Sequence, residues 1–366
     1  MYRTTISLIL LLVISLTSTA QKQKPVKNII LMVGDGMGVA QIYAGLTANR
    51  GSLNLEKCTA VGFHKNQSSD KYVTDSAAGA TAFACGVKTY NGAIGVNDAK
   101  QPVTTILEIA EKHGLATGLV ATCAITHATP ASFIAHQPSR AMEEEIAMDF
   151  LATDIDLFIG GGRKFFRDRA DKLNLLDSLT AKGYQVVHSM DEVQKINTGK
   201  LAAFLADEQQ PKFSDGRGDE LVRSTERALA LLGTNNKGMF LMIEGSQIDW
   251  GGHANNSQYI IDEMVDFDKA IGKVLDFASR DGQTLVIITA DHETGGFSLT
   301  GGDMATGTVE GKFTTGSHTG VMIPVFAFGP GAEQFSGIYE NTAIFDKMLS
   351  AYSFKGSKKA KQNSLP

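Results

Sequence analysis

The sequence predicts a single α/β domain with a mostly parallel central β-sheet and helices on both of its faces. Short, nearly continuous apolar segments alternate along the chain with segments of helical period, a pattern typical of buried parallel strands joined by helices. The composition supports a globular chain with a large core, because 43% of the 366 residues are hydrophobic and 20% are charged. No internal repeat or long linker interrupts the pattern.

The candidate strands are six short apolar segments that favour burial on both faces of a sheet. They are residues 28–33, 116–121, 156–159, 239–243, 284–289 and 321–328. Helical period is found between them, and the clearest helical segments are residues 104–113, 143–151, 219–232 and 258–278.

The two ends of the chain are expected to lie outside this domain. Arg3, the apolar run at 6–16 and the small residues at 18–20 form the pattern of a secretory signal peptide. The run is too short for a comfortable membrane span, so we expect a periplasmic or secreted protein with no membrane partner. The chain then divides into a signal peptide at 1–20, one domain at 21–352 and a basic, flexible tail at 353–366.

Charge and cysteine content exclude several classes of function. The formal net charge is −5, from 34 Lys and Arg against 39 Asp and Glu, whereas broad nucleic-acid binding requires clustered basic residues. Cys58, Cys85 and Cys123 allow at most one disulfide, and no C-x-x-C spacing predicts a thiolate zinc site. We interpret all three as small core residues.

Acidic and histidine side chains follow three of the predicted strands, where a parallel sheet collects its functional groups. They are Asp35 after 28–33, then Glu244, Asp249 and His253 after 239–243, then Asp291 and His292 after 284–289. Each has a plainer interpretation by itself: a turn aspartate, an i,i+4 surface pair, a capped strand end. Together, however, so many carboxylates would repel one another without cations. The sequence therefore predicts two or three divalent metal ions at this edge, zinc where His and Asp meet and magnesium where Glu and Asp meet a hydroxyl.

A candidate nucleophile stands in Thr-Asp75-Ser76-Ala-Ala, before a run of small helix formers. Ser76 can be interpreted as an ordinary helix N-cap. Alternatively, the helix N-terminus and a neighbouring zinc would stabilise its alkoxide. No hydrolase-type Ser-His-Asp spacing surrounds Ser76, which makes metal activation the more economical mechanism.

A third segment, residues 125–140, offers groups suited to a phosphate or sulfate dianion. Thr129 before Pro130 fits a helix N-cap followed by proline in the first turn, and Arg140 fits a solvated surface arginine. A guanidinium is, however, the group that binds such a dianion through two parallel hydrogen bonds.

These separated motifs, in this order, resemble those of the alkaline phosphatase family, in particular its compact bacterial members such as the cold-active enzymes of Antarctic and marine bacteria. The resemblance extends from about residue 28 to residue 330. It implies hydrolysis of small-molecule phosphate monoesters at alkaline pH through a phosphoserine intermediate, with two Zn²⁺ and one Mg²⁺ per chain. It also implies a homodimer and no specificity for nucleic acid.

The resemblance further implies a role for each matching residue. Ser76 matches the nucleophile, and Asp75 matches the residue that orients Arg140 toward the substrate. The metal ligands it implies are Asp249, His253 and His318 for the first zinc, Asp35, Ser76, Asp291 and His292 for the second zinc, and Asp35, Thr129 and Glu244 for magnesium. Of these residues, His318 is nominated by the resemblance alone.

Two positions differ from the best-known enteric enzyme, since His127 and Trp250 stand where that enzyme has Asp and Lys. The resemblance places His127 beside the third metal and Trp250 near the substrate phosphate. Only 25 residues separate His292 from His318, which leaves no room for the large surface insertion of some relatives. The other histidines match no motif and are interpreted as structural or surface residues: His64, His113, His136 and His188.

Two alternatives use the same ligands. A related sulfatase or phosphodiesterase would share the sheet and metals, but a sulfatase requires Cys or Ser followed by x-Pro-x-Arg, and neither Ser76 nor any cysteine has that continuation. An exported metal- or phosphate-binding protein without turnover would have no use for Ser76 beside the second zinc ligands.

Overall fold

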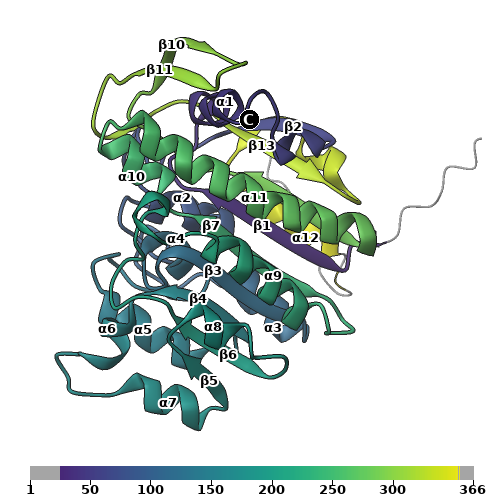
Figure 1. Cartoon of the computed structure of the whole chain (residues 1–366). Helices are drawn as coiled ribbons and strands as arrows, with labels where there is room; N and C mark the ends of the chain where they lie inside the picture. The colour runs from purple at the N-terminus through teal and green to yellow at the C-terminus, as the bar shows by residue number, and fades with distance from the viewer. Residues whose placement is uncertain (1–24, 353, 355–366) are drawn as a thin grey trace, which may run out of the picture.

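A ten-stranded sheet runs through the molecule, with helices packed on both of its faces (Figure 1). The computed structural model describes residues 25–352 and residue 354, so the predicted signal peptide and nearly all of the predicted tail lie outside the described residues. The strand order is β14-β2-β13-β8-β1-β7-β3-β4-β6-β5. Only β13 runs antiparallel to its neighbours, β2 and β8, within this sheet. The predicted fold class is therefore confirmed.

The strands of this sheet are β1 (Asn28–Gly34), β2 (Ala60–Lys65), β3 (Ala116–Ala124), β4 (Leu157–Gly161), β5 (Tyr184–Val187), β6 (Lys200–Phe204), β7 (Met239–Gly245), β8 (Thr284–Thr289), β13 (Ile323–Phe328) and β14 (Gly337–Glu340). Two small additions complete the strands: β10 (Ser298–Asp303) pairs with β11 (Thr308–Lys312), and β9 (Glu293–Thr294) pairs with β12 (His318–Thr319).

The longer helices are α1 (Val39–Ala48), α2 (Ser76–Cys85), α3 (Ile106–Lys112), α5 (Glu143–Ala152), α7 (Leu175–Ala181), α9 (Glu220–Leu232), α11 (Ser257–Asp281) and α12 (Ala343–Tyr352). Shorter turns of helix are η1 (Asn54–Lys57), α4 (Ala128–Ala131), α6 (Arg163–Arg167), α8 (Met190–Val193), η2 (Phe213–Asp215), α10 (Ile248–His253) and η3 (Ala332–Phe335). No helix among the described residues has the length and apolar character needed to cross a membrane.

The central strands are buried on both faces, which explains their continuous apolar sequences. Every residue of β1, β3, β7 and β8 is buried. Alternate residues of β1 enter opposite cores, with Leu31 packing on the side of α2, α5 and α12 and Met32 on the side of α1, α9 and α11. The sheet therefore packs against a hydrophobic core on each of its faces, and this packing fixes the positions of its strand ends.

Several predicted boundaries and omissions are corrected by the structure. The strand predicted at 321–328 begins only at Ile323, because Val321 and Met322 are exposed, and the one predicted at 156–159 runs from 157 to 161. The outer strands β2, β5, β6 and β14 were not predicted. They are short, and β2 alternates buried and exposed residues instead of forming a continuous apolar run.

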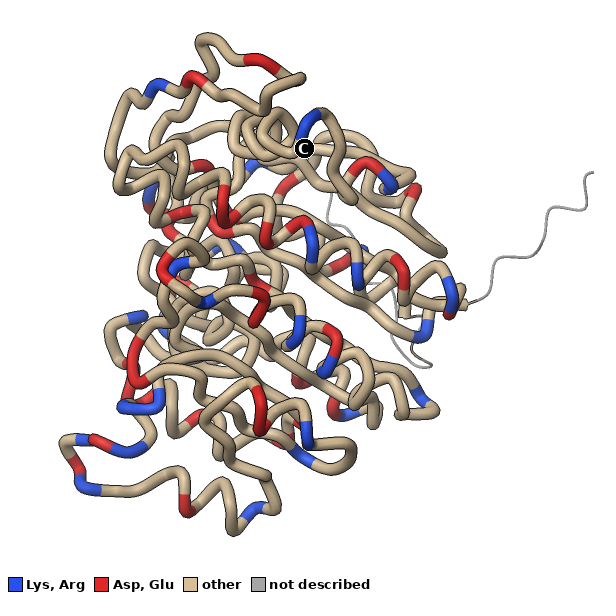
Figure 2. The backbone as a smooth tube through the Cα atoms, in the orientation of Figure 1, with Lys and Arg blue, Asp and Glu red and all other residues tan. Residues whose placement is uncertain are grey.

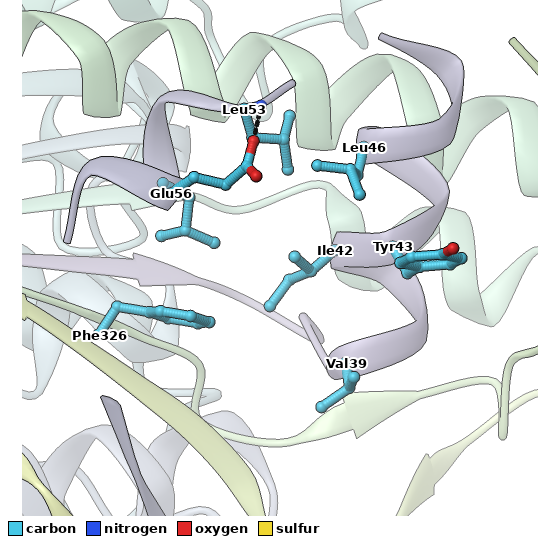
Figure 3. A pocket seen from close by; sticks show the side chains of 8 residues that line it. Val39, Ile42, Tyr43, Leu46, Leu53, Glu56 and Phe326 are labelled. Atoms are coloured by element: carbon cyan, nitrogen blue, oxygen red, sulfur yellow. Dashed lines mark hydrogen bonds between the residues drawn. The ribbon is translucent and has the colours of Figure 1, made fainter. Parts of the chain in front are cut away.

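Charged residues of both signs are interspersed along the chain in Figure 2. An apolar surface pocket of about 210 Å³ lies between α1, η1 and β13 (Figure 3). No residue predicted for the functional site lines this pocket. All three cysteines are free, with Cys85 and Cys123 buried and Cys58 half-buried.

Candidate active site

The sheet order brings the predicted strand-end residues together. Strand β1 lies between β8 and β7, and Val33 is in register with both Thr289 and Glu244. The segments that follow these strands, with Asp35, Asp291 and the helix α10, therefore leave the sheet side by side. All six of the acidic and histidine residues nominated from the strand ends lie in this region, and His318 joins them on β12.

Asp249, His253 and His318 form the first group, in which one possible ligand atom from each lies within 4.8 Å of the others. Asp249 Oδ1 is 3.4 Å from His253 Nε2 and 3.5 Å from His318 Nε2, and the two Nε2 atoms are 3.1 Å apart. Each ring contacts a backbone carbonyl through Nδ1: that of Gly316 for His253 and that of Thr74 for His318. A histidine that donates one ring N–H to a carbonyl is oriented to offer the other nitrogen to a metal.

The second group surrounds His292, which is fully buried. Its Nε2 is 3.2 Å from Ser76 Oγ, 3.2 Å from Asp291 Oδ2 and 3.5 Å from Asp35 Oδ1. Neither carboxylate oxygen of Asp35 has a hydrogen-bond partner, although the residue is buried. Such orphaned oxygens are the groups that a cation would satisfy.

Asp249 also contributes to this second group, together with Asp35 and His292. The resemblance assigned Asp249 to the first zinc alone, whereas its carboxylate here stands between the two groups. The closeness of the groups suits two cations that act on one small anion.

The buried carboxylates have shifted acidities. Burial, followed by the charges of Asp291, Asp249 and Glu244, raises the pKa of Asp35 well above its usual range. Burial also raises the pKa of Glu244 to about 7 and, with the charge of Asp249, that of Asp291 to about 6. The raised pKa values indicate that ionising these carboxyl groups together is unfavourable when no cation neutralises their charge.

Around the histidines of the site, the charged forms of Asp249 and His253 stabilise each other. Burial opposes ionisation of Asp249, but the hydrogen bond from His253 and the charges of His292 and His318 hold its pKa below the usual range. The hydrogen bond to Asp249 raises the pKa of His253 to about 9, while burial and the nearby His318 lower the pKa of His292.

A third group lies beside Glu244, which is fully buried and has no partner for Oε1. Thr129 Oγ1 is likewise buried and unpartnered. Thr129 lies within α4 and is not its N-cap, a position taken by His127. The plainer interpretation of Thr129 as a capping residue is therefore wrong.

Ser76 is the first residue of α2, and the N-cap is Asp75, whose Oδ1 accepts a hydrogen bond from the Ala78 N–H at 3.0 Å. The interpretation of Ser76 as the capping residue is thus also wrong, and its hydroxyl is free to face His292. Asp75 uses its other oxygen to accept from Arg140 Nη1 at 3.1 Å. The helix cap and the arginine are therefore held by one carboxylate.

Arg140 and Trp250 lie at the edge of the site, where both contact the ring of His127. Arg140 Nη2 is 3.2 Å from His127 Nε2, and the edge-on contact between the rings of His127 and Trp250 has a centroid distance of 6.3 Å. Trp250 is partly buried against the core. Its indole thus packs beside the residues that flank Arg140.

Sequence reasoning missed Thr294 and did not place His64 next to the site. Thr294 Oγ1 donates to Asp249 Oδ1 and lies 3.2 Å from His292 Nδ1, so it joins the two groups. His64 was interpreted as structural, and its Nε2 lies 2.9 Å from the carbonyl of Ala290, directly before Asp291. Thr294 stands in Asp-His-Glu-Thr-Gly-Gly, but only its distance from Asp249 in space reveals the contact.

Gly36 allows these segments to approach closely. Its φ of +74° favours glycine, and a Cβ there would lie 2.6 Å from the Cα of Asp249. Its N–H donates to Asp291 Oδ1 at 3.3 Å. The residue after Asp35 therefore has to be small for the strand ends to meet.

The fold and this cluster define a metal-dependent hydrolase of the α/β class, and the comparisons with known proteins specify which kind. The alkaline phosphatase family profile matches residues 26–312, and the chain belongs to that family. Alkaline phosphatase 3 of Bacillus subtilis is 34% identical, with 91% of this chain and 90% of that protein covered.

Two solved structures of cold-active type give the same result in three dimensions. Alkaline phosphatase from the Antarctic bacterium TAB5 has a TM-score of 0.87 and 47% identity over 90% of this chain and 99% of its own. The cold-active alkaline phosphatase of Shewanella sp. has a TM-score of 0.82 and 33% identity over 89% of this chain and 99% of its own. A histidine-to-aspartate variant of the TAB5 enzyme has Mg bound in its M3 site.

The chain is thus a metal-dependent alkaline phosphatase that hydrolyses phosphate monoesters. The sulfatase, phosphodiesterase and non-catalytic alternatives are not favoured by these relatives.

Proposed function

We propose that this chain hydrolyses phosphate monoesters through a phosphoserine at Ser76, with two Zn²⁺ and one Mg²⁺ per chain. The observation that supports this most directly is the contact of 3.2 Å between Ser76 Oγ and His292 Nε2 at the N-terminus of α2. A serine that only began a helix would have no reason to face a buried histidine flanked by two carboxylates.

The donor sets fit the three metal ions. The first zinc is assigned to Asp249, His253 and His318, and the second to Asp35, Ser76, Asp291 and His292, where nitrogen and carboxylate donors meet. The unpartnered oxygens of Glu244, Thr129 and Asp35 suit the harder magnesium. When bound, the zinc ions supply Lewis-acid stabilisation of the entering and leaving oxygens and lower the pKa of water.

The residues of the chain then divide the work. Arg140 binds two oxygens of the phosphate dianion through its guanidinium, and Asp75 keeps that guanidinium in place. The hydroxyl proton of Ser76 passes to solvent, and its Oγ attacks phosphorus in line with the leaving oxygen. The ester bond breaks, and the leaving oxygen takes up a proton from solvent and departs as the alcohol. Partial positive charge at the N-terminus of α2 stabilises the serine oxygen. Water then attacks phosphorus from the opposite side, which restores Ser76 and releases inorganic phosphate.

We also propose that the protein is exported after removal of residues 1–20 and that it forms a homodimer. Support for a second copy comes from the apolar surface around the pocket of Figure 3, where Val39 and Tyr43 of α1 are 56% and 51% exposed. Exposed apolar groups of this kind are typically buried in dimers. Tyr43→Glu should yield a monomer by light scattering, whereas Leu173→Glu, at another exposed apolar residue, should leave the dimer intact. A parent protein that is monomeric would contradict the dimer.

The direct test of the proposed reaction uses a chromogenic phosphate monoester. Activity should be lost with a chelator and return on addition of Zn²⁺ and Mg²⁺. The same preparation should be far less active on the matching sulfate ester and phosphodiester. Phosphate binding without release of the chromogenic alcohol would instead indicate the non-catalytic alternative.

A further inference from the structure

Glu293, the first residue of β9, is a buried carboxylate beside the site that the proposed reaction does not use. Each of its oxygens accepts two hydrogen bonds. Oε1 accepts from Gln41 Nε2 at 2.8 Å and from the Phe297 N–H at 2.9 Å. Oε2 accepts from the Gly296 N–H at 3.2 Å and from the hydroxyl of Thr319. One carboxylate thus joins three separate segments: α1, the turn after β9, and β12.

The strand pair formed by β9 and β12 has two faces with different contacts. Thr319 lies opposite Glu293, and His318 lies opposite Thr294. Because opposite residues share a face and side chains alternate along a strand, His318 and Thr294 lie on one face and Glu293 and Thr319 on the other. The first face meets the site, since His318 Nε2 and Thr294 Oγ1 both approach Asp249 Oδ1. The hydrogen bond between Glu293 and Thr319 is therefore made behind the strand that carries His318.

This strand pair depends on its side chains for a fixed position. It contains two residues on each strand and is separate from the ten-stranded sheet. A strand pair this short is at best marginally stable by itself. Gln41 Nε2 donates to the carbonyl of Thr294 at 2.9 Å and so connects β9 to α1. The carboxylate of Glu293 then connects β12 to β9 through Thr319.

The donors around Glu293 require a carboxylate and not an amide. Gln has the same shape, but its side chain offers one accepting oxygen and one donating NH₂ group. In either orientation of the amide, the NH₂ would face a backbone N–H, that of Gly296 or that of Phe297. Two donors that face each other leave both unsatisfied, so the side chain would shift and its link to Thr319 would weaken.

We propose that Glu293 is a positioning residue, which acts through Thr319 to hold His318 in place as a ligand of the first zinc ion. The inference rests on the proposed function, which assigns that ion to His318 together with Asp249 and His253. Replacing a residue that orients a metal ligand typically weakens metal binding about 10- to 100-fold. A residue that merely stabilised the local turn would leave the affinity for zinc unchanged or weaken both zinc groups alike.

The first test uses Thr319→Val, which replaces the hydroxyl by a methyl group and leaves Glu293 in place. Zinc is titrated into metal-stripped protein in competition with a chromophoric chelator, with excess Mg²⁺ and no substrate. One of the two zinc equivalents should bind about 10- to 100-fold more weakly than in the parent, while the affinity for the other is unchanged. Equal affinities in the variant and the parent, or equal weakening of both equivalents, would overturn the proposal.

Two further variants at threonine positions serve as controls. Thr319→Ser retains the hydroxyl and should bind both zinc equivalents as tightly as the parent. Thr308→Val is the matched control in β11, because the Thr308 hydroxyl is exposed and contacts that of Thr306, at 2.9 Å. It should leave both affinities unchanged. Binding by Thr319→Ser that is as weak as binding by Thr319→Val would show that the hydroxyl is not the linking group and would overturn the proposal.

The second test asks whether Glu293 and Thr319 act as one unit. Glu293→Gln should weaken binding of the same zinc equivalent as Thr319→Val. The double variant should bind that equivalent no more weakly than the weaker of the two single variants, because both substitutions break one link. Losses that add in full would mean that Glu293 does not act through Thr319, which contradicts the proposal.

These outcomes are separate from those of the proposed function. If the parent releases the chromogenic alcohol but zinc binds equally well to Thr319→Val and the parent, this inference alone fails. If one zinc equivalent is weakened in Thr319→Val but the parent releases no alcohol, the proposed reaction fails and the role of Glu293 stands.

Discussion

At the scale of single residues, Arg140 is held before any substrate arrives. Asp75 accepts from its Nη1 at 3.1 Å, and His127 Nε2 lies 3.2 Å from its Nη2. A guanidinium fixed from two sides loses less conformational freedom when it binds a dianion. Its contribution should therefore appear mainly in affinity for phosphate.

Arg140→Ala should weaken inhibition by inorganic phosphate about 10- to 100-fold, since hydrogen bonds between charged groups contribute roughly 1.5–3 kcal/mol. The loss in kcat should be smaller, because the metal ligands remain. The measurement is the phosphate inhibition constant, with Arg163→Ala as control at an arginine that pairs with Asp207 instead. An unchanged constant in Arg140→Ala would show that Arg140 does not contact phosphate.

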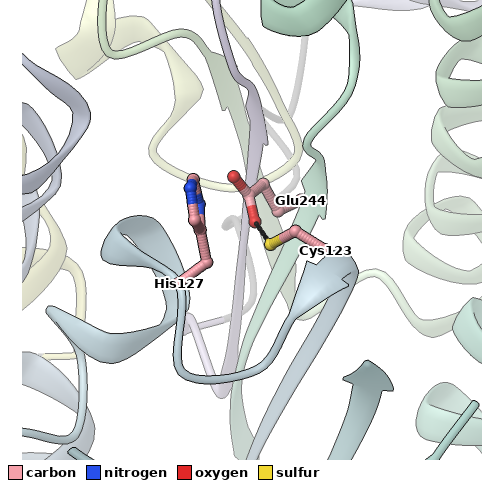
Figure 4. A group of neighbouring side chains, drawn as sticks. All are labelled: Cys123, His127 and Glu244. Carbon is pink, nitrogen blue, oxygen red and sulfur yellow. Dashed lines mark hydrogen bonds between the residues drawn. The ribbon is translucent and has the colours of Figure 1, made fainter. Parts of the chain in front are cut away.

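The role of a residue could be predicted from the sequence where a motif or the end of a predicted strand marks its position. It could not be predicted where the contact joins segments that are far apart in the sequence. Asp35, Glu244 and Asp291 could be grouped because each follows an apolar strand of a parallel sheet. The contact between Thr294 and Asp249 could not be predicted in this way, because the two residues are 45 positions apart and meet only when α10 packs beside β9. Cys123 is buried in the core as predicted, but its contact with Glu244 (Figure 4) could not be foreseen, because Glu244 lies on another strand.

At the scale of elements, the helix α2 positions the nucleophile by packing closely against the segment after β8. A Cβ added to Gly79 of α2 would lie 3.0 Å from the Cβ of Asp291, tighter than an ordinary contact. The glycine therefore sets the distance between the Ser76 helix and the residues Asp291 and His292. Alanine would favour the helix by about 1 kcal/mol but would push α2 away from this segment.

Gly79→Ala should reduce kcat roughly 3- to 10-fold through misalignment of Ser76, while the free energy of unfolding changes by less than about 1 kcal/mol. Gly272→Ala is the matched control. Gly272 lies in the helix α11, and a Cβ there would also crowd a neighbouring side chain, that of Asn54. The measurement is kcat alongside denaturant unfolding for both variants. A fall in kcat that is equal in the two variants would mean that α2 packing does not govern alignment.

Among the elements, those predicted from sequence are the ones buried on both faces. Strands β1, β3, β7 and β8 have continuous apolar sequences because no residue in them meets solvent. Outer strands carry weaker signals: β6 reads Lys-Leu-Ala-Ala-Phe, and alanine favours helices. Their formation depends on pairing with a sheet already present, which no local pattern records.

At the scale of the whole molecule, the site places several carboxylates inside the fold, so metal binding and stability are linked. In the metal-free protein, burial raises the pKa of Glu244 to about 7 and that of Asp291 to about 6, from ordinary values of 4.5 and 3.8. At these two carboxyl groups, the folded state binds more protons than the unfolded state between the ordinary and the raised pKa. This outweighs the opposite effect of the lowered pKa values of His64, His127 and His292 only because further buried groups, among them Asp35 and Glu111, also have raised pKa values. Stability consequently falls as pH rises through this range.

Metal-free protein should therefore show a lower Tm at pH 8 than at pH 5, and the protein loaded with its metals should show a much weaker dependence, because the cations neutralise the carboxylates. Thermal unfolding with and without chelator at the two pH values measures this. A metal-free Tm that stays constant or rises between pH 5 and pH 8 would contradict the linkage.

The proposed reaction requires Ser76 to carry the phosphoryl group during turnover, and that group can be trapped there. The protein is mixed with a phosphate monoester, quenched in acid and digested, and the peptide containing Ser76 is examined by mass spectrometry. We expect phosphate on Ser76 in the parent, and in Ser76→Ala no labelled peptide, bound zinc retained and kcat at least about 10³-fold lower. Parent-like turnover in Ser76→Ala, or phosphate trapped on another residue, would contradict the account.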